Sequence, residues 1–163
     1  MEALKAACQA SDWEGVKAAL EQDAALVNAQ DESTKWTALH FATKAGSLET
    51  VKAVLAAKAD VDARTHHDST ALHIAACNGL DKIAFELIKA GCPLEALDNK
   101  RNTALVRSGQ HGHCGVAALL LAAGADTTST NVDGQTVDAR AREGGHEAVL
   151  HILAGFANPP AKR

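Results

Sequence analysis

The chain has 163 residues, of which 47% are hydrophobic and 22% charged, a composition typical of one soluble domain. Its formal net charge is −4, which argues against non-specific nucleic-acid binding because such binding needs a basic surface. No uncharged apolar run reaches the roughly 20 residues of a membrane span, and the polar N-terminus carries no secretory signal, so we expect no membrane attachment.

The cysteines indicate the cellular compartment. They are spread along the chain without a C-x-x-C pair, as Cys8, Cys77, Cys92 and Cys114. Such spacing is typical of thiols in a reducing compartment. We therefore expect a cytoplasmic or nuclear protein.

Residues 1–33 are expected to form an N-terminal capping unit of two helices. Leu4 and Cys8 would share one face of the first helix, and Val16 and Leu20 would share one face of the second. The threonine that opens later units is missing here, as expected of a terminal unit with one side in water.

The following residues contain one pattern four times, at a constant interval. Each copy pairs a threonine with a glycine nine residues later: Thr37 with Gly46, Thr70 with Gly79, Thr103 with Gly112, and Thr136 with Gly145. A period of this length, about 33 residues, signals a stacked-repeat architecture. We expect units at residues 34–66, 67–99, 100–132 and 133–157.

One copy shows how a unit is expected to fold. Thr70 has the hydroxyl that caps a helix, and His73 lies where a capping-box side chain reaches back to the cap. Gly79 would end this helix in the left-handed conformation. A second helix would follow, with Ile83 and Leu87 on one face.

The sequence Thr-Ala-Leu-His at residues 70–73, the glycine in mid-unit and the closing Ala-Asp motifs at residues 59–63 and 124–126 resemble the ankyrin repeat. The resemblance covers nearly the whole chain. It implies an all-α solenoid of stacked helix–turn–helix units joined by protruding β-turn fingers. The first and fifth units would be caps.

Some positions depart from the repeat. Ser108 and Gly109 stand where two alanines are usual, and a mid-helix glycine costs up to about 1 kcal/mol against alanine, so we expect the least rigid internal helix there. Asp138 stands where leucine is usual, which fits a polar C-terminal cap. Residues 158–163 are expected to form a disordered tail.

The sequence contains none of the common short motifs of enzymes or phosphate-binding proteins. It contains no phosphate-binding loop, no G-x-S-x-G and no H-E-x-x-H, so we expect neither catalysis nor a bound cofactor. An alternative is a metal- or redox-responsive regulator that uses His66, His67, His111 and Cys114. Equivalent positions in adjacent units lie roughly 8–10 Å apart, whereas a metal needs donors at about 2 Å. We therefore expect no metal site, and a ladder rather than a pocket from His113 and His146.

The resemblance implies that a partner protein binds the finger tips and the exposed positions of the first helix of each unit. Together with the charge pattern below, this selects the following candidate partner-binding residues: Thr34, Lys35, Trp36, Lys44, His66, His67, Ser69, Asn78, Lys100, Arg101, Asn102, Arg107, Gln110 and His111.

The two tryptophans are expected to play different roles. Trp36 precedes a cap threonine on a finger, and exposed aromatic residues are favoured interface anchors. The alternative, which stays open, is that its ring folds onto a neighbouring finger and fills a gap. Trp13 starts the second helix of the N-terminal cap and is expected in the core.

Positive charge also gathers on the expected finger side. It comes from Lys35, Lys44, Lys100, Arg101 and Arg107, with His66 and His67 between them. A basic concave strip would attract an acidic peptide or loop. The alternative is a solvated face with scattered charges, since surface charges usually serve solubility.

The fingers pose a conformational question. The glycine of the repeat's turn survives only as Gly134, and Lys35, Asp68 and Arg101 replace it elsewhere. These three residues are strained if the turn needs a positive φ. The alternative is a different type of turn.

The sequence thus predicts a monomeric, non-enzymatic protein-interaction module that holds another protein against its concave side, as an inhibitor or a scaffold. The metal- or redox-responsive regulator is the first alternative. Nucleic-acid binding through the basic strip is a weaker one.

Overall fold

The computed structural model describes residues 1–157. Residues 158–163, for which a disordered tail is expected, lie outside this range. The described helices are α1 (Glu2–Gln9), α2 (Trp13–Gln22), a 3-10 helix η1 (Ala24–Asn28), α3 (Ala38–Ala45), α4 (Leu48–Ala56), α5 (Ala71–Asn78), α6 (Asp81–Lys89), α7 (Ala104–His111), α8 (Cys114–Ala122), α9 (Val137–Glu143) and α10 (Glu147–Ala157).

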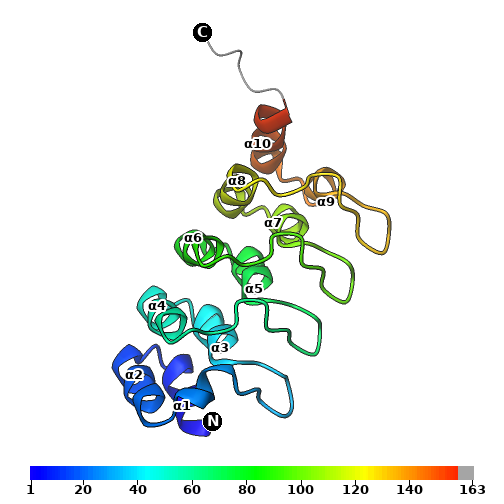
Figure 1. Cartoon of the computed structure of the whole chain (residues 1–163). Helices are drawn as coiled ribbons and strands as arrows, with labels where there is room; N and C mark the ends of the chain where they lie inside the picture. The colour runs from blue at the N-terminus through cyan, green and yellow to red at the C-terminus, as the bar shows by residue number, and fades with distance from the viewer. Residues whose placement is uncertain (158–163) are drawn as a thin grey trace.

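These helices form five antiparallel pairs stacked in a row (Figure 1). The inner helices α1, α3, α5, α7 and α9 form one layer, and the outer helices α2, α4, α6, α8 and α10 form the other. The loops that join one pair to the next project as fingers beyond the inner layer. No strand is present among residues 1–157. The predicted all-α solenoid is confirmed.

The repeated threonines begin four inner helices as predicted, and the repeated glycines Gly46, Gly79 and Gly112 end three of them. The fourth, α9, ends instead at Gly144, one residue before the repeated Gly145. Thr37, Thr70, Thr103 and Thr136 are the N-caps of α3, α5, α7 and α9. The backbone N–H of Thr70 donates to Nδ1 of His73 at 3.2 Å, which completes the expected capping box. Gly79 ends α5 with φ of 65°, the left-handed conformation that glycine adopts without strain.

The core lies between adjacent pairs. Leu39, Leu72 and Leu105 occupy equivalent positions in three inner helices, and each is 1% exposed. The buried alanines around them let neighbouring helices approach closely.

The position expected for Trp13 was wrong, because 45% of its side chain is exposed. Asp12 caps α2 by accepting a hydrogen bond from the N–H of Gly15, which makes Trp13 the first helical residue. The core positions of α2 are Val16 and Leu20, at helical spacing from one another. By spacing Trp13 falls on the same side of the helix, but it is the first residue of α2 and lines a hollow between α2 and α4 instead of joining the core.

Gly109 is a poor helix former, but the absence of a side chain at this position is needed for packing against Val137. A β-carbon built on it would lie 2.6 Å from Cγ2 of Val137 and 3.0 Å from the Val137 carbonyl oxygen. The missing side chain therefore lets α9 approach α7 closely. The expectation that α7 is the least rigid internal helix stays a prediction.

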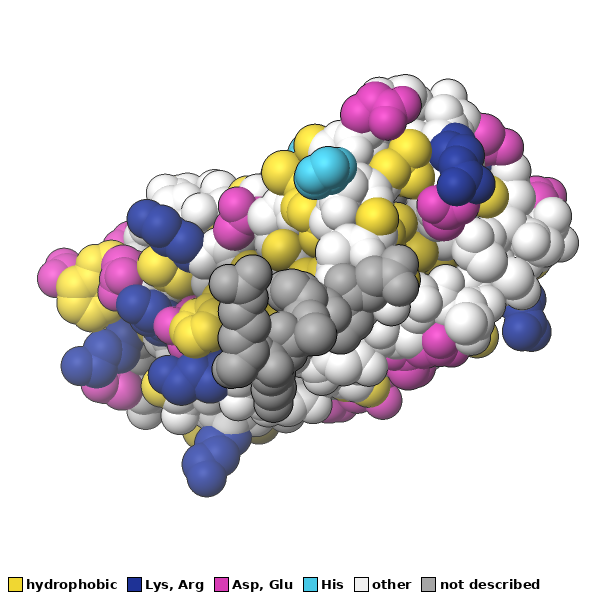
Figure 2. Space-filling view, turned by 90° about the horizontal axis from the view of Figure 1, so that it is seen from above, with side chains coloured by type: hydrophobic (Ala, Val, Ile, Leu, Met, Phe, Trp, Pro, Cys, Tyr) yellow, Lys and Arg dark blue, Asp and Glu magenta, His cyan; other side chains and the backbone are white. Residues whose placement is uncertain are grey.

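The C-terminal end of the array is only partly polar. Asp138 pairs with Arg142 on α9, in place of the usual leucine. On α10, however, Phe156 is 46% exposed and Leu150 is half-buried. Figure 2, seen from this end, shows apolar side chains at the surface among charged ones.

None of the helices within residues 1–157 has the length and apolar character needed to cross a lipid bilayer.

Replacing Gly109 by alanine should destabilise the protein, although alanine is the better helix former. We expect a loss of about 1–3 kcal/mol from overpacking against Val137, measured by urea unfolding. The matched control is Gly155→Ala on α10, where a β-carbon would meet no atom within 4 Å, and a gain of up to about 1 kcal/mol is expected. If both changes stabilise the protein, α9 does not pack against α7 at this point.

Candidate functional site

The four fingers are each built around one buried polar side chain. These side chains are Asp31, Thr65, Asp98 and Asn131, and all are less than 8% exposed. In the finger of residues 98–102, Oδ1 of Asp98 accepts hydrogen bonds from the N–H groups of Lys100 and Asn102, both at 2.9 Å. The side chain therefore replaces the hydrogen bonds that a strand partner would supply to a buried loop.

Backbone hydrogen bonds also connect each finger to the next. The N–H of His66 donates to the carbonyl oxygen of Thr34 at 3.1 Å, and that of Asn99 donates to the carbonyl of His67 at 2.9 Å. The N–H of Val132 donates in the same way to Lys100, at 3.0 Å. We call these three bonds the finger ladder. It holds the finger tips of all four loops in register.

The turn at each finger tip requires a positive φ. The values are 57° for Lys35, 55° for Asp68, 59° for Arg101 and 72° for Gly134. The alternative of a different turn type is therefore wrong. A left-handed conformation costs a non-glycine residue roughly 1–2 kcal/mol, so three fingers retain strain while they expose a charged side chain.

Two histidines connect the inner helices to the fingers of the next unit. Nε2 of His40 donates to the carbonyl oxygen of Ser69 at 3.2 Å, and Nε2 of His73 donates to that of Asn102 at 3.0 Å. Nδ1 of each ring accepts from the N–H of its cap threonine, so each ring is neutral with its proton on Nε2. Burial lowers the pKa of His40 to about 4 and also lowers the pKa of His73. The capping role predicted for His73 is confirmed, and His40 has the same role at the equivalent position. Both rings also link adjacent units.

His113 and His146 form the ladder that the sequence predicts. Nε2 of His113 donates to the carbonyl oxygen of Cys77 at 3.1 Å, and Nε2 of His146 donates to that of Gln110 at 3.0 Å. Each ring thus reaches the end of the preceding inner helix. Within residues 1–157, no three His, Cys, Asp or Glu side chains gather closely enough to hold a metal ion.

The concave face is the surface made by the fingers and the exposed sides of the inner helices. It contains a hollow of about 480 Å³, lined by Trp36, Lys44, His67, Ser69, His73, Ile74, Cys77, Asn78, Asn99, Lys100 and Arg107. A second hollow of about 470 Å³ adjoins it and is lined by Gln9, Thr34, Trp36, Phe41, Lys44 and Ala45. Neither lining includes an aspartate or glutamate, although the chain has 20 acidic residues.

The two hollows bring eight of the predicted residues together. These are Thr34, Trp36, Lys44, His67, Ser69, Asn78, Lys100 and Arg107. The remaining six lie outside them: Lys35, His66, Arg101, Asn102, Gln110 and His111. Sequence reasoning missed Ile74 and Phe41, which look like ordinary core residues in the helical pattern but reach the floor of a hollow.

Trp36 is partly packed and partly exposed, and its role as an interface anchor stays a prediction. Its ring is half-buried, with its centroid 5.2 Å from that of Phe41 and 6.0 Å from that of His40. The ring therefore packs on its own inner helix rather than on a neighbouring finger. Its remaining surface lines both hollows, and it lies where they meet.

One predicted contact residue is not accessible. Asn102 is 2% exposed, and its Nδ2 donates to the Asp98 carboxylate. Asn102 thus belongs to the base of its finger and cannot reach a partner with its side chain. The sequence does not show this, because an asparagine in a turn is usually exposed.

The basic strip is also smaller than predicted. Arg107 forms an ion pair with Asp98, whose side chain is fully buried, and its Nη1 donates to Gln110 at 3.3 Å. Burial of Asp98 opposes its ionisation, but the Asn102 N–H and the Arg107 guanidinium outweigh this and hold its pKa below the ordinary value. The charge of Arg107 is thus neutralised. Within residues 1–157, Lys35, Lys44, Lys100 and Arg101 form no ion pair, and all four are exposed.

A family model described as ankyrin repeats (3 copies) matches residues 1–65 and 61–131. No curated protein matches the chain.

The buried histidines should make stability depend on pH. Burial holds the pKa of His40 at about 4 in the folded protein, against 6.5 ordinarily, so between these values the unfolded chain binds a proton that the folded chain does not. The contribution of His40 is complete above pH 6.5 and declines as the pH falls toward 4. This shift corresponds to roughly 3 kcal/mol.

His40→Gln tests this contribution, because glutamine keeps a capping-box acceptor but does not titrate. We expect the free energy of unfolding, measured in urea from pH 7 to pH 4, to fall less steeply in the variant. The control is His66→Gln at an exposed histidine, which should follow the wild-type curve. An unchanged slope in His40→Gln would contradict a neutral His40 ring in the folded state.

Proposed function

The chain belongs to the ankyrin-repeat family, and from that membership we propose that it is a non-enzymatic module that holds a partner protein against its concave face. Ankyrin repeats are generally protein–protein interaction modules and are generally not enzymes. The observation that supports the proposed face is the pair of adjoining hollows, with Trp36 between them and no acidic side chain in their lining.

We propose that the partner presents an acidic peptide or loop. Lys44 approaches the larger hollow from α3 and Lys100 from the finger of the fourth unit, and neither forms an ion pair within the described chain. Trp36 and Ile74 provide an apolar floor between them. An apolar side chain of the partner on this floor, with carboxylates beside it, would complement both features.

A pre-ordered surface favours this mode of binding. The finger ladder holds the tips in register before the partner arrives, so less conformational entropy is lost on association. The protein would act as a monomer, either as an inhibitor that covers the partner's working surface or as a scaffold that positions it.

We also propose a cytoplasmic or nuclear location. All four cysteines are free thiols, which is usual in a reducing compartment. Burial raises the pKa of Cys77, and it raises those of Cys8 and Cys92 to about 12. These three thiols are poor nucleophiles at neutral pH, so they give no support to a redox-responsive role for Cys8, Cys77 or Cys92.

Affinity capture with matched charge reversals tests the proposed face. Lys44→Glu combined with Lys100→Glu should lose partner proteins that the wild type captures from native lysate, because two cations of the larger hollow become anions. The control is Lys82→Glu combined with Lys89→Glu, which makes the same charge change on the outer helix α6 and should keep those partners.

Trp36→Ala provides a second arm of the same experiment. It should also lose the partners, together with about 1–3 kcal/mol of stability, since part of the ring packs on α3. Partners lost equally from the concave variants and from the outer-helix control would place the binding site elsewhere.

A further inference from the structure

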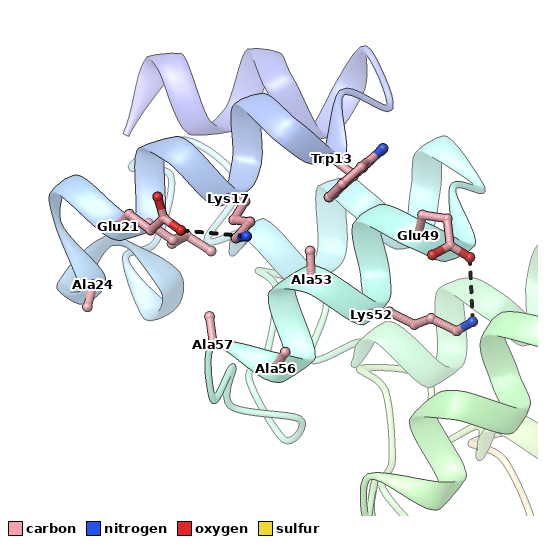
Figure 3. A pocket seen from close by; sticks show the side chains of 10 residues that line it. Trp13, Lys17, Glu21, Ala24, Glu49, Lys52, Ala53, Ala56 and Ala57 are labelled. Atoms are coloured by element: carbon pink, nitrogen blue, oxygen red, sulfur yellow. Dashed lines mark hydrogen bonds and ion pairs between the residues drawn. The ribbon is translucent and has the colours of Figure 1, made fainter.

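A larger hollow lies on the opposite side of the molecule from the fingers, between the outer helices α2 and α4 (Figures 1 and 3). Its volume is about 580 Å³. It is lined by Trp13, Lys17, Leu20, Glu21, Ala24, Glu49, Lys52, Ala53, Ala56 and Ala57. We call it the outer groove. None of these residues belongs to the concave face.

The groove exists because α4 carries small residues where the next outer helix carries large ones. Ala53 and Ala56 correspond, one repeat later, to Glu86 and Lys89 of α6. The side chains of Ala53 and Ala57 point from α4 toward α2 and form the floor (Figure 3). The repeat therefore tolerates long side chains at these positions, and their absence opens the groove.

The wall contributed by α2 combines an aromatic ring with charge. Trp13, Lys17 and Glu21 follow one another at intervals of four residues, so they share one face of the helix. Trp13 lies above Ala53 on the side of Glu49, and Lys17 lies farther along the groove beside Glu21 (Figure 3). Large exposed aromatic side chains of this kind are favoured interface anchors.

The charges along the groove are available to a ligand. Nζ of Lys17 lies 3.8 Å from Glu21, and the side chains are 65% and 68% exposed. On α4, Nζ of Lys52 lies 3.5 Å from Glu49, also at an exposed site. Exposed pairs within one helix are worth only about 0.3–0.5 kcal/mol, so a ligand carboxylate would compete for Lys17.

The walls of the groove determine what conformation fits it. Both walls are helices, whose backbone N–H and C=O groups are bonded within the helix, so the groove has no sheet edge with which an extended strand could pair. A helix satisfies its own backbone and can place a ridge of side chains between α2 and α4. Because α2 has 10 residues and is thus about 15 Å long, roughly three turns of helix would fit.

We propose that the outer groove docks one amphipathic helix of a partner protein, with its large apolar side chains over Ala53 and Ala57 and against Trp13, and with an acidic side chain facing Lys17. This site goes beyond the proposed function because it lies opposite the concave face. The protein would then hold a second partner while the concave face is occupied, which is the behaviour of a scaffold.

Trp13 fluorescence provides the assay. The chain has two tryptophans, so Trp36→Phe leaves Trp13 as the only one. The probe is an end-blocked, alanine-based peptide of about 14 residues, a length at which such a sequence begins to form a helix in water. It has no aromatic side chain, and it carries four leucines in one stripe with a glutamate in the middle of that stripe. Its twin carries lysine in place of the glutamate.

We expect the glutamate peptide to shift Trp13 emission to shorter wavelength in a saturable manner, because the ring leaves water. The lysine peptide should bind more weakly, by roughly threefold or more, as one exposed ion pair and its reversal allow. Lys17→Glu should reverse this preference. Lys82→Glu, on the neighbouring outer helix, is the control and should leave the preference unchanged.

Ala53→Glu tests the groove itself, since it gives α4 the residue that α6 carries at the same position. Binding of both peptides should be lost while circular dichroism stays that of the wild type. Three outcomes would overturn the proposal: no emission shift at millimolar peptide, equal binding of both peptides in wild type and Lys17→Glu, or a shift that depends on protein concentration alone, which would mean that a second copy fills the groove.

Discussion

The burial of each helix pair against the next is the constraint on which this structure depends. The described α-helices have 7 to 11 residues, a length at which isolated helices are marginal in water. Leu39, Leu72 and Leu105 become buried only because the neighbouring units cover them. The rings of His40 and His73 add hydrogen bonds across the same boundaries. No unit has a closed core of its own, so position within the array decides the role of each side chain.

The same constraint explains why some positions recur in every unit whereas others differ from unit to unit. Cap threonines, helix-ending glycines and inner leucines recur because every boundary between units needs them. The two proposed binding surfaces arise where the repeat varies: Trp36 and Lys100 give the concave hollows their apolar floor and positive charge, and Ala53 opens the outer groove. These surfaces lie on opposite sides of the two helical layers and share no lining residue (Figure 1).

Much of the fold could be predicted from the sequence, because the regular period marks equivalent positions. Thr70, His73 and Gly79 have local roles that depend on a few neighbouring backbone atoms, and the structure confirms all three. Trp13 was misplaced because its helical spacing to Val16 and Leu20 indicates the core face, whereas at the first position of α2 its ring lines the outer groove.

The candidate site was less predictable, since exposure depends on tertiary contacts. Asn102 and Arg107 look like surface residues, but Asp98 draws both into the base of a finger. Asp98 itself was missed, although Thr65, Asp98 and Asn131 each lie five residues before a cap threonine, which is a signal that sequence reasoning could have used. The outer groove could not be predicted from the regular spacing of the repeat. It results from small residues at positions where the next unit has long side chains.

The central claim is that neighbouring units hold one another's fingers in place, and amide hydrogen exchange tests it most directly. The N–H groups of His66, Asn99 and Val132 cross from one finger to the next, and they lie in loops that would exchange rapidly if each finger moved alone. The structure predicts that these three amides exchange as slowly as those of α5 and α7. Rapid exchange at all three, with α5 and α7 still protected, would contradict it.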